Sequence, residues 1–232
     1  MVKLFFLCRR RPDVTHAQYA DLLLGGHVPI ALRHHPTMRR YVVNVVEETR
    51  PGAPELDSIG QLWFDSLDDY RLRLYDSPEG ERIVHEDVAR FMGAADAYAT
   101  TEHVQRDDRP RAPLGTRSPG VKLICPLRRR PDLTHDAFVR HWLGTHVPLA
   151  KRHHPGLVGY VTNVVEAKLS PGGADWDGFA ELWFASAEDA TTRMWDSPEG
   201  ERIVRDDIAK FIGWTTPYRV AEWIQRAMPD AR

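Results

Sequence analysis

The stretch VKLFFLCRRRPD at residues 2–13 returns as VKLICPLRRRPD at 121–132, and DSPEGERIV occurs at both 76–84 and 196–204. The offset between copies is 119 residues for the first string and 120 for the second, so the second copy carries one extra residue between them. A unit of this length exceeds the period of about 20–50 residues that is typical of solenoid repeats. Each copy is long enough to form a small domain with its own core. The sequence therefore predicts a covalent pseudo-dimer.

The composition fits two soluble domains of about 110 residues each. We expect a first repeat at residues 1–105, a linker at 106–120 and a second repeat at 121–226. Hydrophobic residues make up 42% of the chain and charged residues 28%, and the formal net charge is −2. This charge gives no general attraction for nucleic acid or anionic membranes. No apolar run approaches the roughly 20 residues that span a bilayer, and no signal peptide is evident. We expect a cytoplasmic protein with no nucleic-acid or membrane partner.

Known metal and nucleophile motifs are not found in the sequence. Cys8 and Cys125 occupy non-equivalent positions of the two repeats, which favours buried free thiols over a shared disulfide or metal site. The adjacent histidine pairs His34-His35 and His153-His154 diverge by roughly 100° on a helix, so neither pair is arranged to share one ion. We therefore predict no metal site and no cofactor.

Hydrophobic patterning predicts the order βαββαβ in each repeat. The glycines at 25, 26 and 144 are expected to stop or bend the first helix, and the Ser-Pro steps at 77–78 and 197–198 to cap the second. The predicted strands are residues 2–8, 40–47, 59–64 and 98–105 in repeat 1, and 121–127, 159–166, 179–184 and 218–225 in repeat 2.

This element order is that of the ferredoxin-like split βαβ unit. Such a unit forms a four-stranded antiparallel sheet with helices on one face, and it leaves the other face apolar and uncovered. A second copy can cover that face. The predicted fold is α+β: two ferredoxin-like repeats packed sheet to sheet within one chain.

Histidine supplies the first candidate chemistry. His27 and His146 both follow a glycine-containing helix segment and precede Val-Pro. The ordinary pKa of histidine, about 6.5, allows proton transfer near neutral pH. The alternative is that each ring caps the preceding helix C-terminus.

Polar side chains on two predicted strands supply further candidates. Side chains alternate along a strand, so Tyr41 and Asn44 lie on opposite faces, as do Tyr160 and Asn163. An asparagine in an apolar strand needs hydrogen bonds. We expect each asparagine either to hold a neighbouring loop or to face a ligand.

On the next predicted strand Glu181 aligns with Gln61, and it shares a face with Trp183 as Gln61 does with Trp63. A carboxylate among aromatic side chains would have a raised pKa and could act as an acid or base. The alternative is an edge residue that reaches water.

The second repeat resembles a known family. The sequence RRPDLT at 129–134, the pair Phe138 and Trp142, and the His146-Val-Pro step resemble the EthD domain of the dimeric α/β-barrel superfamily. Repeat 1 departs from this pattern with Tyr19 and Leu23 at the aromatic positions. The resemblance implies an intramolecular dimeric α/β barrel and cofactor-free chemistry on small aromatic or polyketide-like molecules, although some relatives bind haem.

These observations favour a cofactor-independent lyase or isomerase that uses His146 and His27, with Glu181, as acid/base groups. We expect His146 to matter more, because it follows Trp142, on which a planar substrate could stack. The alternatives are a cofactor-free or haem-dependent oxidoreductase of the anthrone-oxygenase type, and a non-catalytic binding protein. The two-repeat chain could itself form a homodimer. The candidate substrate-binding residues are Trp142, Tyr160, Asn163, Tyr41, Asn44, Trp183 and Trp63.

Overall fold

Both repeats follow the order strand, helix, strand, strand, helix, strand in the computed structural model, which describes residues 1–228. The elements of repeat 1 are β1 (Val2–Arg10), α1 (His16–Asp21), η1 (Leu22–His27), α2 (Val28–His34), β2 (Arg40–Thr49), β3 (Ser58–Phe64), α3 (Leu67–Arg73), α4 (Pro78–Ala89) and β4 (Met92–Asp107). Those of repeat 2 are β5 (Val121–Arg129), α5 (His135–His141), η2 (Trp142–His146), α6 (Val147–His153), β6 (Leu157–Lys168), β7 (Gly178–Phe184), α7 (Ala187–Thr192), α8 (Pro198–Phe211), β8 (Ile212–Thr215) and β9 (Tyr218–Arg226).

The strands form one closed barrel. Repeat 1 contributes the order β4-β1-β3-β2, and its edge strands β4 and β2 pair antiparallel with β6 and β9 of repeat 2. Pairing of β7 with β5 completes the ring. The two sheets also meet face to face inside it, where the rings of Phe5 and Phe179 stack with centroids 4.4 Å apart. The predicted facing of two sheets is therefore accompanied by hydrogen-bonded edges, which leave no exposed edge between the repeats.

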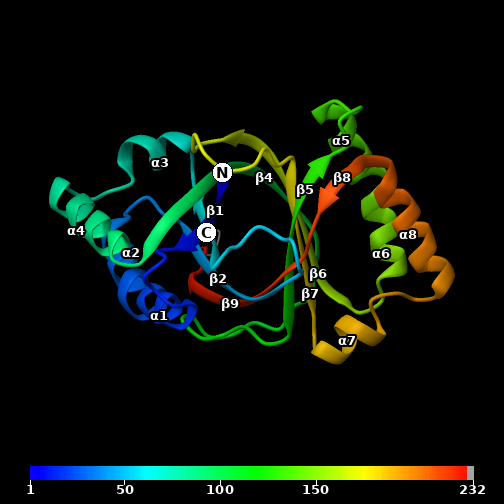
Figure 1. Cartoon of the computed structure of the whole chain (residues 1–232), viewed down its shortest axis with the longest axis horizontal. Coiled ribbons are helices and arrows are strands. Elements are labelled where there is room, and N and C mark those ends of the chain that lie inside the picture. The colour runs from blue at the N-terminus through cyan, green and yellow to red at the C-terminus, as the bar shows by residue number, and fades with distance from the viewer. Residues whose placement is uncertain (229–232) are drawn as a thin grey trace.

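The helices cover the outside of the barrel. Those of repeat 1 lie on one flank and those of repeat 2 on the other (Figure 1). This arrangement creates three apolar cores: one inside the barrel, and one between sheet and helices in each repeat. Among residues 1–228, no helix has the length and apolarity needed to cross a membrane.

The first helix of each repeat continues through the glycines that were expected to end or bend it. In repeat 1 the helix widens into the π turn η1, where the amide of Val28 donates to the carbonyl of Leu23 five residues earlier. Pro29 follows directly, and its ring would clash with the carbonyl of residue 25 in a regular α-helix. The wider turn accommodates the proline and places His27 on the inner side of the helix.

The second helix of each repeat begins as predicted. Ser77 accepts a hydrogen bond from the amide of Gly80 at 3.0 Å, and Ser197 accepts the matching bond from Gly200 at 3.0 Å. A Cβ on Gly80 would overlap the carboxylate of Asp76. The identical DSPEG strings therefore reflect a tight turn that needs serine and glycine at these positions.

The closing strands differ from their predicted bounds. In repeat 1, β4 is longer at both ends than the predicted 98–105. In repeat 2 the strand is interrupted between β8 and β9 at Pro217, because proline cannot donate to the ladder. The predicted exposed linker also makes a packed contact: the guanidinium of Arg109 lies 4.0 Å from the ring centroid of Trp183, and the arginine stem crosses Gly159.

Candidate functional site

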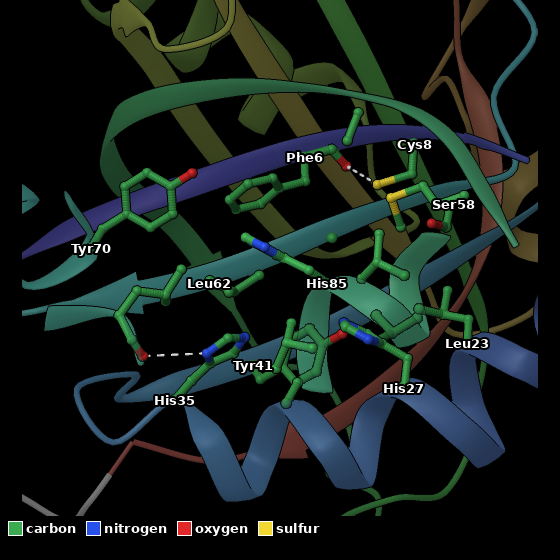
Figure 2. A pocket seen from close by; sticks show the side chains of 18 of the residues that line it. Phe6, Cys8, Leu23, His27, His35, Tyr41, Ser58, Leu62, Tyr70 and His85 are labelled. Carbon is green, nitrogen blue, oxygen red and sulfur yellow. Dashed lines mark hydrogen bonds between the residues drawn. The ribbon is translucent and has the colours of Figure 1, made fainter. Parts of the chain in front are cut away.

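A cavity of about 240 Å³ lies between the sheet and the helices of repeat 1 (Figure 2). Its walls are mainly apolar and come from the outer faces of β1, β2 and β3 and from η1, α2, α3 and α4. The lining includes Phe6, Leu23, Tyr41, Leu62 and Tyr70. Hydrophobic and aromatic side chains with a few convergent polar groups are typical of a small-molecule site.

His27 is the best-placed titratable group in this cavity. Its Nδ1 atom lies 3.1 Å from Oδ2 of Asp87 on α4, and both side chains are buried. Because a carboxylate accepts, Nδ1 carries the proton and Nε2 keeps a free lone pair. Burial lowers the pKa of His27, and the hydrogen bond to Asp87 offsets only part of that effect. His27 is therefore neutral at pH 7 and able to accept a proton.

His35 is a second histidine in the same cavity. Its Nδ1 atom lies 3.3 Å from the carbonyl oxygen of Leu74. Burial lowers the pKa of His35 to about 4, with a smaller contribution from nearby His27 and an opposing one from the Leu74 carbonyl. At the mouth, Tyr75 and the exposed His85 form a hydrogen bond of 2.9 Å.

The equivalent space in repeat 2 is occupied by a side chain. Trp142 stands where repeat 1 has Leu23, and it is 1% exposed. Its ring lies against Gly178, where a Cβ would overlap it; the corresponding residue of repeat 1 is Ser58. The indole therefore fills the crevice from within. The sequence-based expectation that a planar substrate stacks on Trp142 is wrong, because the indole ring is buried in the core of repeat 2 and has no free face.

His146 has the same local geometry as His27 but a different setting. Its Nδ1 atom lies 3.0 Å from Asp207, and His141 lies 2.9 Å from the other oxygen of that carboxylate. The ring of His146 packs against Phe211, with centroids 5.1 Å apart. Neither His27 nor His146 caps a helix end, so in both repeats an aspartate is the partner instead.

The barrel interior holds a separate cluster of charges. Lys3 lies 2.5 Å from Glu181 and 2.7 Å from Glu102, and Lys122 lies 2.8 Å from Glu181 and 2.6 Å from Glu222. Both lysines and Glu181 are at most 3% exposed. Glu181 therefore links a lysine of each repeat across the barrel.

Glu181 is not the acid/base group that the sequence suggested. Burial alone would raise the pKa of Glu181, but Lys122 and Lys3 outweigh burial and lower it well below its usual range. The carboxylate stays ionised at neutral pH. The sheet also separates it from both His27 and His146, which lie on the outer, helix-covered face.

The predicted strand residues divide between the two sides of the sheet. Tyr41 and Tyr160 lie on the outer face in the cores of their repeats, and Tyr41 lines the cavity. Asn44 faces the interior, where it donates to the carbonyl of Ile59 at 2.8 Å and accepts from Lys122 at 2.8 Å. Asn163 likewise donates to Phe179 and to Glu181. Both asparagines thus join strands and interior charges, which is neither of the two expected roles.

The two tryptophans of the predicted site also face the interior. Lys3 lies 4.7 Å from the ring centroid of Trp63, and Lys122 lies 4.6 Å from that of Trp183. These cation–π contacts help to hold the buried ammonium groups. Trp63 and Trp183 therefore belong to the interior charge cluster and not to the cavity beside His27.

The sequence patterns did not predict the aspartate partners of the histidines or the two buried lysines. Asp87 and Asp207 occupy equivalent positions in the two repeats, so the duplication itself could have identified them as histidine partners. Lys3 and Lys122 alternate with outward-facing apolar residues on β1 and β5, which could have placed them inside. What the sequence could not show is which distant carboxylates they meet.

The cysteines and the first histidine of each adjacent pair have structural roles. Cys8 and Cys125 are free thiols, and burial raises the pKa of Cys8 to about 11, so it stays protonated at neutral pH. His34 lies 3.1 Å from Asp76, and His153 lies 2.9 Å from Asp196. Within residues 1–228 no group of three or more histidine, cysteine, aspartate or glutamate side chains is arranged to hold a metal ion.

The fold and the comparisons together identify the family. Two βαββαβ repeats closed into one barrel define a dimeric α/β-barrel protein whose two halves share a chain. Residues 11–95 and 130–214 each match the sequence model of the EthD domain. The chain therefore belongs to the EthD-domain family and carries two copies of the domain, as its motifs predicted.

Solved structures share this fold at low sequence identity. An anthrone oxidase-like protein is 10% identical, with a TM-score of 0.63 over 100% of this chain and 95% of that chain. A provisionally assigned monooxygenase from Fusobacterium nucleatum is 5% identical, with a TM-score of 0.59 over 99% and 94%. A second one, from Lactobacillus acidophilus, is 8% identical, with a TM-score of 0.55 over 97% and 96%. A comparison with curated proteins yields no match.

Proposed function

We propose that the cavity of repeat 1 binds a small planar aromatic molecule and that His27, oriented by Asp87, removes a proton from it. The observation that carries the proposal is a neutral, carboxylate-oriented imidazole in the wall of an apolar cavity. A general base held in this way contributes about 10²–10⁴ to a rate. Asp87 keeps the proton on Nδ1, so that Nε2 is the accepting atom.

The cavity volume supports a ligand of two or three fused rings. A cavity of about 150 Å³ in another protein binds benzene, and drug-sized ligands occupy about 300–1,000 Å³. The cavity here, about 240 Å³, lies between these sizes. Its aromatic lining, including Phe6, Tyr41 and Tyr70, suits a planar ring system.

Oxygenation is the reaction that we favour after proton removal. The compared structures are named as an anthrone oxidase-like protein and as monooxygenases, and none is named as a lyase or isomerase. In an anthrone-type substrate a CH₂ group beside aromatic rings loses a proton to His27, and the resulting carbanion gives electrons to dioxygen. Overall, CH₂ and O₂ become C=O and H₂O, so the step needs no cofactor for its electron balance.

The residues of the cavity do not fit a haem group. A porphyrin is larger than the ligands that a space of about 240 Å³ admits. We therefore derive no step through haem.

The geometry favours His27 over His146 as the base, which reverses the order expected from the sequence. Trp142 fills the crevice beside His146, whereas Leu23 leaves space beside His27. The two histidines have matching aspartate partners, so each is the natural control for the other.

The test is oxygen uptake and quinone formation with anthrone as the substrate. His27→Ala is expected to lower kcat by about 10²–10⁴, and His146→Ala to leave it close to that of the wild type. Substrate turnover without oxygen consumption would favour the lyase or isomerase alternative. Full activity of His27→Ala would remove its role as the base, and ligand binding without any turnover would indicate a binding protein.

A further inference from the structure

The hydrogen bond of His35 fixes which of its ring nitrogens faces the cavity. A carbonyl oxygen can only accept, so Nδ1 of His35 donates to the carbonyl of Leu74, 3.3 Å away. The ring is neutral at pH 7 because burial disfavours its charged form. Nε2 therefore carries a lone pair and no proton.

This lone pair is directed into the cavity. Figure 2 shows the bond to Leu74 on one side of the His35 ring and the second nitrogen on the opposite side, toward Tyr41 and the cavity interior. His27 reaches the same cavity from the other end of α2. The cavity thus presents two imidazole acceptors, separated by the length of a two-turn helix.

An acceptor in an apolar wall selects for a ligand that donates. A buried lone pair without a donor is costly, so a site of this kind rejects analogues that lack the matching group. We propose that His35 recognises a hydroxyl group on the aromatic ligand, which makes the preferred substrate a phenol. This inference rests on the proposed function for the location of the site, and it adds a specificity-determining residue to it.

Repeat 2 provides an internal control. His154 is equivalent to His35, and its Nδ1 atom lies 2.5 Å from the carbonyl oxygen of Met194. Trp195 covers its ring, with centroids 4.4 Å apart. The backbone bond is thus common to both repeats. His35 lines an open cavity, whereas Trp142 fills the equivalent space in the repeat of His154.

The test compares the binding of 1-naphthol and 1-methylnaphthalene, which differ by a hydroxyl and a methyl group of similar size. Calorimetric titration gives the ratio of their Kd values for each variant. His35→Asn keeps an amide N–H near the position of Nδ1 and removes the acceptor at Nε2. His35→Gln places a carbonyl oxygen near Nε2 and retains the acceptor. His154→Asn is the matched control in repeat 2.

We expect His35→Asn to lower the preference for 1-naphthol by about threefold to tenfold. His35→Gln is expected to retain more of the preference than His35→Asn, and His154→Asn to leave it unchanged. An unchanged ratio in a folded His35→Asn protein would overturn the inference.

A measurement on the unmodified protein removes the dependence on variant folding. The ¹⁵N resonance of His35 Nε2 should shift on addition of 1-naphthol and stay in place with 1-methylnaphthalene. Equal responses to both ligands would contradict the hydroxyl contact. Since neither measurement involves turnover, they can fail while His27 remains the base, and they can succeed while the proposed reaction fails.

Discussion

Replacing Glu181 by glutamine tests how the two repeats are held together. The Glu181 carboxylate accepts hydrogen bonds from Lys3 at 2.5 Å and from Asn163 at 3.0 Å, forms an ion pair with Lys122 at 2.8 Å, and is 1% exposed. Removing one partner of a buried ion pair costs about 3–5 kcal/mol. Each lysine keeps one other carboxylate, and glutamine keeps one acceptor oxygen. We therefore expect a loss near the lower end, about 3 kcal/mol in the free energy of unfolding.

The pH dependence gives this prediction a second, independent feature. The pKa of Glu181 is lowered in the folded protein, so its stabilisation is complete above the ordinary glutamate pKa of about 4.3. The stabilisation is lost as the pH falls from there toward the folded-state pKa, by at most about 1.4 kcal/mol per pH unit. The stabilities of wild type and Glu181→Gln should therefore converge in acid.

The assay is urea unfolding followed by tryptophan fluorescence at pH 7 and at pH 3.5. The control is Glu201→Gln, which removes an exposed ion pair with Arg205 and should leave the unfolding midpoint almost unchanged. A Glu181→Gln protein as stable as the wild type at pH 7 would refute the reasoning. So would a stability difference that does not shrink at pH 3.5.

Further predictions concern the cavity, a tight turn and repeat 2. Asp87→Asn should lower kcat by about 10²–10⁴, because it no longer holds the proton on Nδ1 of His27, while a binding titration with 1-naphthol stays unchanged. Burial lowers the pKa of His27 below the ordinary histidine value of about 6.5. In a pH profile of kcat/KM, activity should therefore fall only when the pH drops below 6.5 and through this lowered pKa. Gly80→Ala should destabilise the protein by about 1–3 kcal/mol in a urea titration, because its Cβ meets the Asp76 carboxylate. Trp142→Leu should cost about 2–5 kcal/mol by the same assay and raise the number of 1-naphthol molecules bound per chain from one toward two.

The order of elements was readable from the sequence because it depends on local signals. The duplicated strings, the Ser-Pro caps at 77–78 and 197–198, and the alternation along β2 all act within a few residues. Barrel closure was not readable in the same way. The pairings of β4 with β6 and of β2 with β9 join residues far apart in the chain, and their register depends on both repeats at once.

Only part of the candidate site could be predicted from the sequence, because the rest depends on contacts between distant strands. The histidines were found from their repeated Val-Pro context, and the difference between Leu23 and Trp142 was visible. Whether a large ring lines a cavity or fills it depends on the residue opposite, and Ser58 and Gly178 lie on a distant strand. Glu181 was misjudged similarly, because Lys3 and Lys122 reach it across the barrel from other strands.

We propose that the ligand site lies in repeat 1, because Leu23 and Ser58 leave the space between sheet and helices open. The most direct test is calorimetric titration of 1-naphthol into the double variant Leu23→Trp, Ser58→Gly. This pair already occurs in the same fold at Trp142 and Gly178, so the variant should remain folded. We expect 1-naphthol binding to be lost in the double variant and to persist in a Trp142→Phe control. Binding of 1-naphthol to the double variant with the wild-type Kd would contradict the location of the site.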